Sequence, residues 1–265
     1  MAKVLKNLLF GYGYNLVALP KADIAPLLLL YKNEDSLSSL DGKLDNFFYI
    51  GEKELPELIV NNTVAGIKGS TVITYDAEGG LSILDSLLSK LKMGKLGGKL
   101  KLDSNDTITI KYEDPKEDKV SLLALDNYIS TSNPSKKKFT TYQEKLEDSE
   151  LYVVNAVLKS NSFSVTVEDS NGQEVDVEAT IKGILDASTN VSRNKKNFIT
   201  LKNTNDTPLV FAYKAQQILY EPAAWWQFFT KEKAKFRIKD QKGEILKGED
   251  DFPTKPLLHA APAEL

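Results

Sequence analysis

Cysteine is absent from this chain of 265 residues, and histidine occurs only once, as His259. The absence of cysteine excludes disulfide bonds, thiol nucleophiles and thiolate metal sites, and it fits a reducing compartment. A lone histidine without clustered carboxylates indicates neither a metal centre nor a nucleophile–base pair. We therefore expect no catalytic residue, no metal and no cofactor.

Long hydrophobic runs are also lacking. The longest, Ala25 to Tyr31, falls far short of the roughly 20 apolar residues that a membrane-spanning helix needs. The stretch from Met1 to Gly11 has neither the length nor the cleavage site of a secretory signal. The glycines from Gly94 to Gly98 lack the Lys-Ser/Thr ending of a phosphate-binding loop. We expect a cytoplasmic protein that is not an enzyme.

The most distinctive segment of the chain is 248–265. Prolines at positions 253, 256 and 262 make it extended or irregular. Its apolar side chains are those of Phe252, Leu257, Leu258 and Leu265. Because a disordered terminus is usually poor in such side chains, we expect this peptide to occupy a groove on the rest of the protein.

A stretch rich in glycine and charge, Asp240 to Asp251, leads into this peptide and has the composition of an exposed, cleavable loop. We place a protease cut near Leu246, Lys247 and Gly248. The chain then divides into a body, 1–247, and a C-terminal peptide, 248–265. The peptide sums to −4 + 1 = −3, which is the whole formal net charge of the chain. Cleavage would leave a body with no net charge.

Two predicted strands flank a predicted helix in the first half of the chain. Thr63 to Tyr75 is rich in β-branched residues, and Thr107 to Tyr112 alternates polar with apolar. Between them, a loop is expected over Asp76–Gly80, followed by an amphipathic helix with Leu81, Leu84, Leu87, Leu88 and Leu91 at helical spacing. The lysines of 81–101, with Asp85 as the one acid, are Lys90, Lys92, Lys95, Lys99 and Lys101. Such a basic amphipathic segment indicates either a membrane surface or a core-facing helix with a solvated lysine face.

A second unit repeats the alternation. Ser160 to Glu168 and Glu174 to Lys182 alternate apolar with polar around the turn Asp169–Gly172, and the apolar stretch Phe198–Leu201 follows further along the chain. A basic loop nearby carries Arg193, Lys195 and Lys196. The alternation is typical of membrane-crossing strands and equally of a soluble sheet with one wet face, so periodicity alone leaves both open.

Elsewhere the pattern predicts simpler elements. Val4, Leu5, Leu8 and Leu9 have the spacing of a short packing helix. Phe47–Ile50 is expected to be a strand, and Leu209–Glu221, which is almost continuously apolar, a central strand.

Two stretches resemble the bacterial gasdermins: Gly11–Leu27, and Pro208–Ala215 followed by Ile218, Tyr220 and Glu221. The resemblance extends over the whole chain in length, in the two hairpin-forming segments and in the short C-terminal peptide. It implies an α+β fold, with a twisted, mainly antiparallel sheet surrounded by helices. It also implies an inactive monomer held by the peptide 248–265, through contacts of Phe252, Leu257, Leu258 and Leu265.

The resemblance further implies a sequence of events. A caspase-like protease would remove the peptide, and the body would insert into the inner membrane. There, residues near 63–112 and 160–201 would refold into hairpins, and many copies would form a β-barrel pore that kills the infected cell in anti-phage defence. The partners are therefore the protease, membrane lipids and further copies of the chain, without nucleic acid. One departure is visible: family members commonly carry an acylated cysteine near the N-terminus, whereas positions 2–6 here are Ala-Lys-Val-Leu-Lys.

Two other functions remain open at this point. One is a soluble lipid-binding or membrane-surface protein that uses 81–101 without making pores. The other is a β-rich interaction module whose C-terminal peptide docks for stability alone.

Overall fold

The computed structural model describes residues 4–7, 9–21, 23–33, 36–49, 54–64, 67, 69–90, 102–134, 140–168, 191–194, 198–202, 208–221, 235–239 and 245–246. The chain forms two compact units. The first contains residues 1–23, 61–117 and 158–212, and the second contains residues 24–60, 118–157 and 213–265. Each unit is therefore assembled from three separate pieces of the chain.

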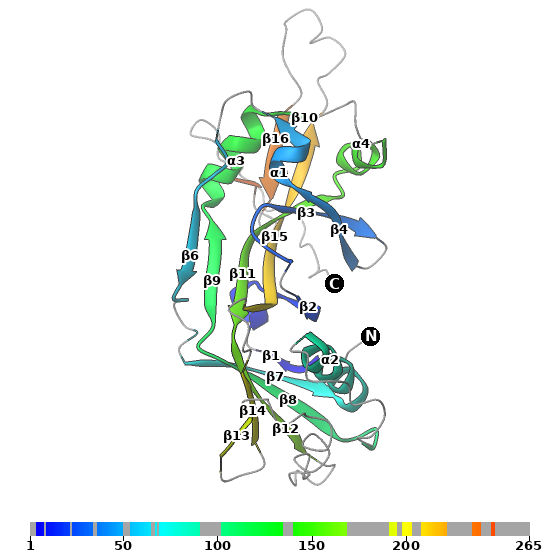
Figure 1. Ribbon diagram of the computed structural model, residues 1–265. Coiled ribbons are helices and arrows are strands. Elements are labelled where there is room, and N and C mark those ends of the chain that lie inside the picture. The colour runs from blue at the N-terminus through cyan, green and yellow to red at the C-terminus, as the bar shows by residue number, and fades with distance from the viewer. Residues whose placement is uncertain are drawn as a thin grey trace, which may run out of the picture. The chain divides into compact units, whose positions relative to one another are not determined.

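The first unit holds a six-stranded antiparallel sheet in the order β1-β7-β8-β12-β14-β13, along which the helix α2 lies (Figure 1). Its elements are β1 (Val4–Asn7), the 3-10 helix η1 (Leu9–Tyr12), β2 (Asn15–Lys21), β7 (Ser70–Asp76), α2 (Ala77–Lys90), β8 (Thr107–Glu113), β12 (Ser162–Glu168), β13 (Val191–Asn194) and β14 (Phe198–Lys202).

The second unit contains most of a larger sheet in the order β17-β16-β15-β11-β3-β4, together with three helices. Its elements are β3 (Leu28–Asn33), β4 (Ser36–Lys43), α1 (Leu44–Phe47), β5 (Phe48–Tyr49), α3 (Leu122–Thr131), β10 (Asn133–Pro134), α4 (Thr140–Glu147), β16 (Lys235–Lys239) and β17 (Ile245–Leu246). Four strands have residues in both units: β6 (Leu58–Asn62), β9 (Lys116–Val120), β11 (Leu151–Ser160) and β15 (Leu209–Glu221).

An aromatic cluster forms the core of the second unit. The rings of Phe47 and Tyr142 have centroids 4.6 Å apart, and Phe48 meets Tyr142 edge-on at 6.2 Å. The hydroxyl of Tyr128 donates to the carbonyl oxygen of Phe48 over 3.1 Å. Gly42 makes room for this packing, because a Cβ there would lie 2.4 Å from Cε2 of Phe47.

The sheets and helices confirm the predicted α+β class with mainly antiparallel pairing. The central position of β15, between β16 and β11, is confirmed as well. The predicted strand at Phe47–Ile50 corresponds to β5, which holds Phe48 and Tyr49, while Phe47 is the last residue of α1 and Ile50 lies outside the described residues.

Two local predictions were wrong. The expected helix around Val4–Leu9 is the strand β1 followed by η1, because residues 4–7 pair with β7, and this tertiary partner overrides the local spacing. The expected loop Asp76–Gly80 is instead the end of β7 and the first turn of α2.

Candidate membrane-inserting sheet

The two segments predicted to enter a membrane lie side by side in the sheet of the first unit. β8 pairs with β7 at seven positions, from Ser70↔Glu113 to Asp76↔Thr107. On its other side β8 pairs with β12, again at seven positions, from Ser162↔Glu113 to Glu168↔Thr107. The sequence presented these segments as two separate hairpins, whereas the fold joins them through the shared strand β8.

This register builds an apolar face from rows of side chains in β7, β8 and β12. Ile73, Ile110 and Val165 form one row across the three strands. Tyr75, Ile108 and Val167 form the next row. All six of these side chains are buried. Cross-strand neighbours of this kind are the unit of sheet stability.

The opposite face is polar and rich in hydroxyls. The Oγ1 atoms of Thr74 and Thr109 lie 3.0 Å apart in a cross-strand hydrogen bond. On β12, however, Ser164 and Thr166 are buried, so the hydroxyl face of this strand is not exposed to water. β12 lies inside the sheet, between β8 and β14, and small hydroxyl side chains tolerate burial when they find hydrogen-bond partners.

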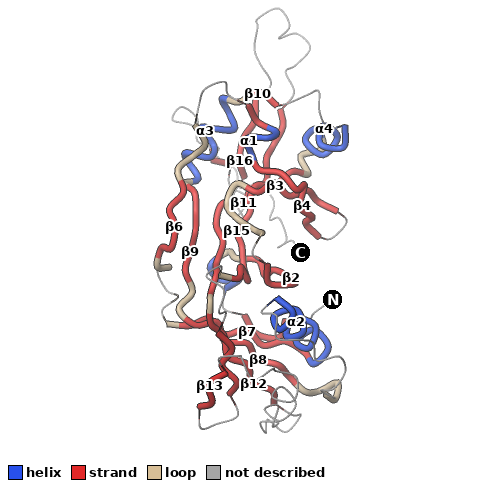
Figure 2. Tube along the Cα trace, in the orientation of Figure 1, coloured by secondary structure: helices blue, strands red, loops and turns tan. Residues whose placement is uncertain are grey.

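The helix α2 lies against the apolar face, next to β7 and β8 (Figure 2). Its first turn begins at once after β7 because Oδ1 of Asp76 accepts a hydrogen bond from the backbone N–H of Gly79 over 2.8 Å. Gly80 provides the close approach: a Cβ there would lie 2.4 Å from Cβ of Ile108. Gly80, which suggested a loop in the sequence, thus lets the helix approach the sheet closely.

The apolar stripe of α2 agrees with the predicted spacing. Leu84, Leu87 and Leu88 are fully buried, together with Ile83, while Leu81 is half-buried. Full burial of such a side chain stabilises the fold by about 1.5–3 kcal/mol. The helix is thereby a cover for the apolar face of β7 and β8.

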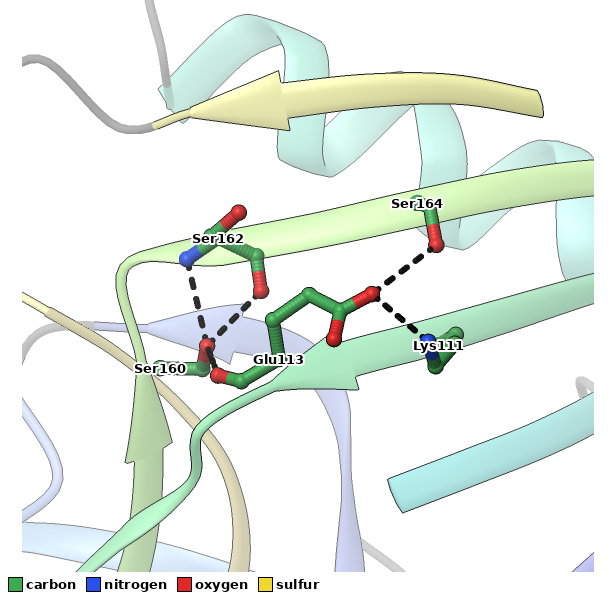
Figure 3. Close-up of polar contacts among 5 residues, drawn as sticks. All are labelled: Lys111, Glu113, Ser160, Ser162 and Ser164. Atoms are coloured by element: carbon green, nitrogen blue, oxygen red, sulfur yellow. Dashed lines mark hydrogen bonds and ion pairs between the residues drawn. The ribbon is translucent and has the colours of Figure 1, made fainter. Parts of the chain in front are cut away.

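A cluster of polar residues lies where β8 ends and β12 begins, and Figure 3 shows its members: Lys111, Glu113, Ser160, Ser162 and Ser164. The hydroxyl of Ser160 donates to the carbonyl oxygen of Glu113 over 2.6 Å and accepts from the backbone N–H of Ser162 over 3.1 Å. The carboxylate of Glu113 lies 3.0 Å from Nζ of Lys111 and 3.5 Å from Oγ of Ser164. This cluster fixes where the two predicted membrane segments start relative to one another.

A stacked pair of rings supports the same strand. Tyr112 of β8 and Phe211 of β15 have centroids 4.0 Å apart at an interplanar angle of 10°, and both side chains are buried. Tyr112 also packs against Phe163 of β12, with the ring centroids 6.2 Å apart. No sequence pattern pointed to the stack, because its two rings come from strands far apart in the chain.

A buried carboxylate lies at the start of β9. Glu117, which is 4% exposed, accepts a hydrogen bond from the hydroxyl of Tyr14 and another, over 3.3 Å, from Nδ2 of Asn62. Burial, the hydrogen bond to Glu117 and the charge of that carboxylate all raise the pKa of Tyr14, so its hydroxyl stays protonated as a donor. Sequence reasoning missed this group, since an isolated Glu in a charged strand carries no signal.

The predicted site residues fall mostly outside the described part of the chain. Lys90 is the last residue of α2. Arg193 was expected in a basic loop, but it lies in the strand β13, where it pairs with Ile199 of β14. Leu246 is the last residue of β17, paired with Ile238. Outside the described residues lie Lys92, Lys95, Lys99, Lys101, Lys195, Lys196, Lys247, Gly248, Phe252, Leu257, Leu258 and Leu265. The predicted turn Asp169–Gly172 and the strand Glu174–Lys182 also lie outside them.

The described residues contain no group of three or more His, Cys, Asp or Glu side chains placed to hold a metal ion. They also contain no helix with the length and apolar character needed to cross a membrane.

The fold and its relatives identify the class of protein. The solved structure of a bacterial gasdermin from Bradyrhizobium tropiciagri matches with a TM-score of 0.52 and 15% sequence identity, over 82% of this chain and 86% of that one. The fold is therefore that of the gasdermins.

Sequence comparison gives the family. The model of the Bacterial Gasdermin Family matches residues 17–244. A gasdermin bGSDM from Gillisia limnaea is 52% identical over 257 residues, covering 97% of both chains. Another, from an unknown prokaryotic organism, is 34% identical over 259 residues with the same coverage. The chain belongs to the bacterial gasdermin family.

Proposed function

We propose that this chain is an autoinhibited pore-forming protein. A caspase-like protease cuts near Leu246, Lys247 and Gly248 and removes the inhibitory peptide 248–265. The body, 1–247, then leaves the cytoplasm, inserts into the inner membrane and assembles from a monomer into a large β-barrel. The resulting pore kills the cell in anti-phage defence.

The observation that carries the proposal is the shared strand β8. Gasdermins are known as pore-forming proteins, and this chain is a family member over nearly its whole length. Segments 63–112 and 160–201 already share one antiparallel sheet through the pairs of β8 with β7 and β12. A barrel wall can therefore keep these pairs and lengthen them, instead of pairing new strands from the start.

The hydrophobic effect supports the direction of the change. In the resting chain, the apolar face of β7 and β8 is buried under α2. In a bilayer, that face meets lipid while the hydroxyl face meets water, and a closed barrel satisfies every backbone hydrogen bond. The residues of α2 lie between β7 and β8 in sequence, so they must leave the sheet if both strands are to lengthen.

The basic residues around these segments suit the membrane encounter. Lysines or arginines near an anionic surface each contribute about 1 kcal/mol of attraction. The proposed contacts are Lys90, Lys92, Lys95, Lys99, Lys101, Arg193, Lys195 and Lys196. Removal of the peptide also removes the net negative charge, which favours the same surface.

The strand β17 lies within the stretch Asp240–Asp251 that was expected to be an exposed loop, so this expectation is wrong at residues 245–246. This strand pairs with β16 through Leu246↔Ile238 and lies beside α3, and it ends at Leu246. The proposed cut thus immediately follows the last described strand. After cleavage, the apolar side chains Phe252, Leu257, Leu258 and Leu265 would be held only by a bimolecular contact, which is weaker than a tethered one.

Dye release from liposomes tests the proposal. A site for a sequence-specific protease is inserted between Lys247 and Gly248 of the full chain, and anionic and neutral vesicles filled with dye are used. We expect release only after cutting, faster from anionic vesicles. Uncut chain that releases dye as fast as cut chain would contradict autoinhibition.

The same assay separates the other functions. A membrane-surface protein would bind the vesicles after cutting without releasing dye or forming rings visible by electron microscopy. An interaction module would lose thermal stability when cut and leave the vesicles untouched. As a control on the tail contacts, Leu257→Asp with Leu258→Asp should release dye without cutting, whereas Asp250→Asn in the same peptide should not.

A further inference from the structure

The outer edge of β7 is covered by a very short strand. β7 is bonded on its inner side to β8 at seven positions, and on its outer side to β1 at three, Val4↔Tyr75, Lys6↔Thr74 and Asn7↔Ile73. Among the described residues, β1 is the first strand of this sheet and β13 is the last. β7 is therefore paired much less extensively on its outer side than on its inner side.

β1 has the properties of a protective edge strand. It is four residues long, its register shifts between Val4 and Lys6, and it carries a lysine. Short length, a bulge and a lysine are the devices by which proteins keep a sheet edge from pairing with another chain. A strand of this kind also separates more easily than the regular β7–β8 pair.

The chain is anchored again immediately after β1. Leu9 is 1% exposed, and its carbonyl oxygen accepts a hydrogen bond from the backbone N–H of Tyr14 over 3.1 Å. The hydroxyl of Tyr14 donates to the buried carboxylate of Glu117. Residues 4–7 can thus leave the sheet while the segment from Leu9 to Tyr14 stays in place.

We propose that β1 covers the outer edge of β7 in the resting chain and must leave this edge before a second copy of the chain can pair there. A closed barrel leaves no strand edge unpaired, so each copy must join the β7 end of its sheet to the opposite end of a neighbour's sheet. That opposite end is formed by β13 and β14. The contact is head-to-tail, the kind that closes a ring. This inference rests on the proposed function and adds to it the strand that must leave.

Engineered disulfides test whether β1 must leave. The chain contains no cysteine, so two introduced ones form the only possible pair. Lys6→Cys with Thr74→Cys joins β1 to β7 at paired positions, where antiparallel Cα atoms lie about 4.5–5.5 Å apart, within disulfide range. After cutting at 247, the oxidised protein should release dye at least about tenfold more slowly than the reduced protein.

A matched pair that shares Thr74→Cys is the control. Thr74→Cys with Thr109→Cys joins β7 to β8, a pairing that the barrel keeps. Oxidised and reduced forms of this variant should release dye at equal rates. If oxidation slows both variants equally, or neither of them, the inference is overturned. If the cut wild-type chain releases no dye at all, the proposed function fails, and this inference with it.

Cross-linking of mixed copies tests the docking partner. Cut Thr74→Cys protein and cut Ser192→Cys protein are combined on anionic vesicles with a short bismaleimide. We expect covalent dimers from the mixture, and none from either protein alone. Dimers from Thr74→Cys alone would mean that β7 edges meet each other, and cross-links absent from a mixture that releases dye would mean that β7 docks elsewhere; either result overturns the inference.

Discussion

In this gasdermin, the core of the second unit and the helix–sheet interface of the first unit are packed in contrasting ways. In the second unit, Phe47 and Phe48 interlock with Tyr142, and a side-chain hydrogen bond from Tyr128 ties the cluster to the backbone. In the first, the interface between α2 and the sheet carries no ring from the helix, whose residues there are glycines and aliphatic side chains.

The difference has a mechanical consequence. Interlocked rings cannot separate without rotamer changes and new cavities, and therefore resist partial opening. The interface of α2 with the sheet has no rings from the helix, so the helix can separate from the sheet without such rearrangements. The unit proposed to refold is thus the one whose helix can lift off, and the other unit is suited to remain intact. Four predictions test this comparison.

The largest effect is expected from Phe48→Ala. Phe48 is fully buried between Tyr142 and the backbone, so truncation should lower the free energy of unfolding by about 3–5 kcal/mol. Urea denaturation measures the loss. Leu123→Ala in the same unit, at a side chain 68% exposed, is the control and should change stability by less than about 0.5 kcal/mol.

Gly80→Ala acts on the other interface. The new Cβ would lie 2.4 Å from Cβ of Ile108, and overpacking of this kind costs about 1–3 kcal/mol, partly offset by the better helix propensity of alanine. Stability should fall and dye release after cutting should become faster, because α2 is already loosened. Gly11→Ala, with nothing within 4 Å of its Cβ, is the control. Equal acceleration by Phe48→Ala would contradict the comparison.

Alkaline pH should weaken both units. Burial raises the pKa of Tyr142 and of Tyr213 in the second unit, and burial with Glu117 raises that of Tyr14 in the first. Such groups stabilise the fold fully below the unfolded pKa of about 10, and this stability is lost as pH rises further, by about 1.4 kcal/mol per pH unit for each tyrosine. Urea midpoints between pH 9 and 11 measure the slope.

Single tyrosine variants show how much each unit contributes to this loss of stability with pH. Among the described residues, the hydroxyl of Tyr142 has no hydrogen-bond partner, so Tyr142→Phe should flatten the slope at little cost in stability at pH 7. Tyr14→Phe should flatten it equally but also cost about 1–3 kcal/mol at pH 7, since it removes a donor from the buried Glu117. Identical stabilities of the two variants at pH 7 would refute this assignment.

The smallest effect separates two helix caps. Oδ1 of Asp76 accepts from Gly79 over 2.8 Å at the start of α2, whereas Oγ of Ser121 accepts from Ala124 over 3.5 Å at the start of α3. Asp76→Ala should cost about 1 kcal/mol, and Ser121→Ala about 0.5 kcal/mol or less. Thermal unfolding of both variants measures the difference, and a larger loss from Ser121→Ala would be contrary to expectation.

Several elements were predictable because their signal is local. The alternation of Thr107–Tyr112 and of Ser160–Glu168 indicated β8 and β12, and the leucine spacing indicated α2. The wrong predictions share one cause. Val4–Leu9 and Asp76–Gly80 take their structure from residues far away, since β7 holds the first and Ile108 lies against the glycines of the second.

By itself, the sequence determined the class of the protein, the absence of cysteine, and the alternation that allows a strand to face two environments. Only the tertiary structure decided that β8 joins the two alternating segments, that α2 covers their apolar face, and that β1 covers the outer edge of β7. The reason is physical: periodicity fixes which side of a strand is apolar, whereas the neighbour that buries it depends on contacts between residues distant in the chain.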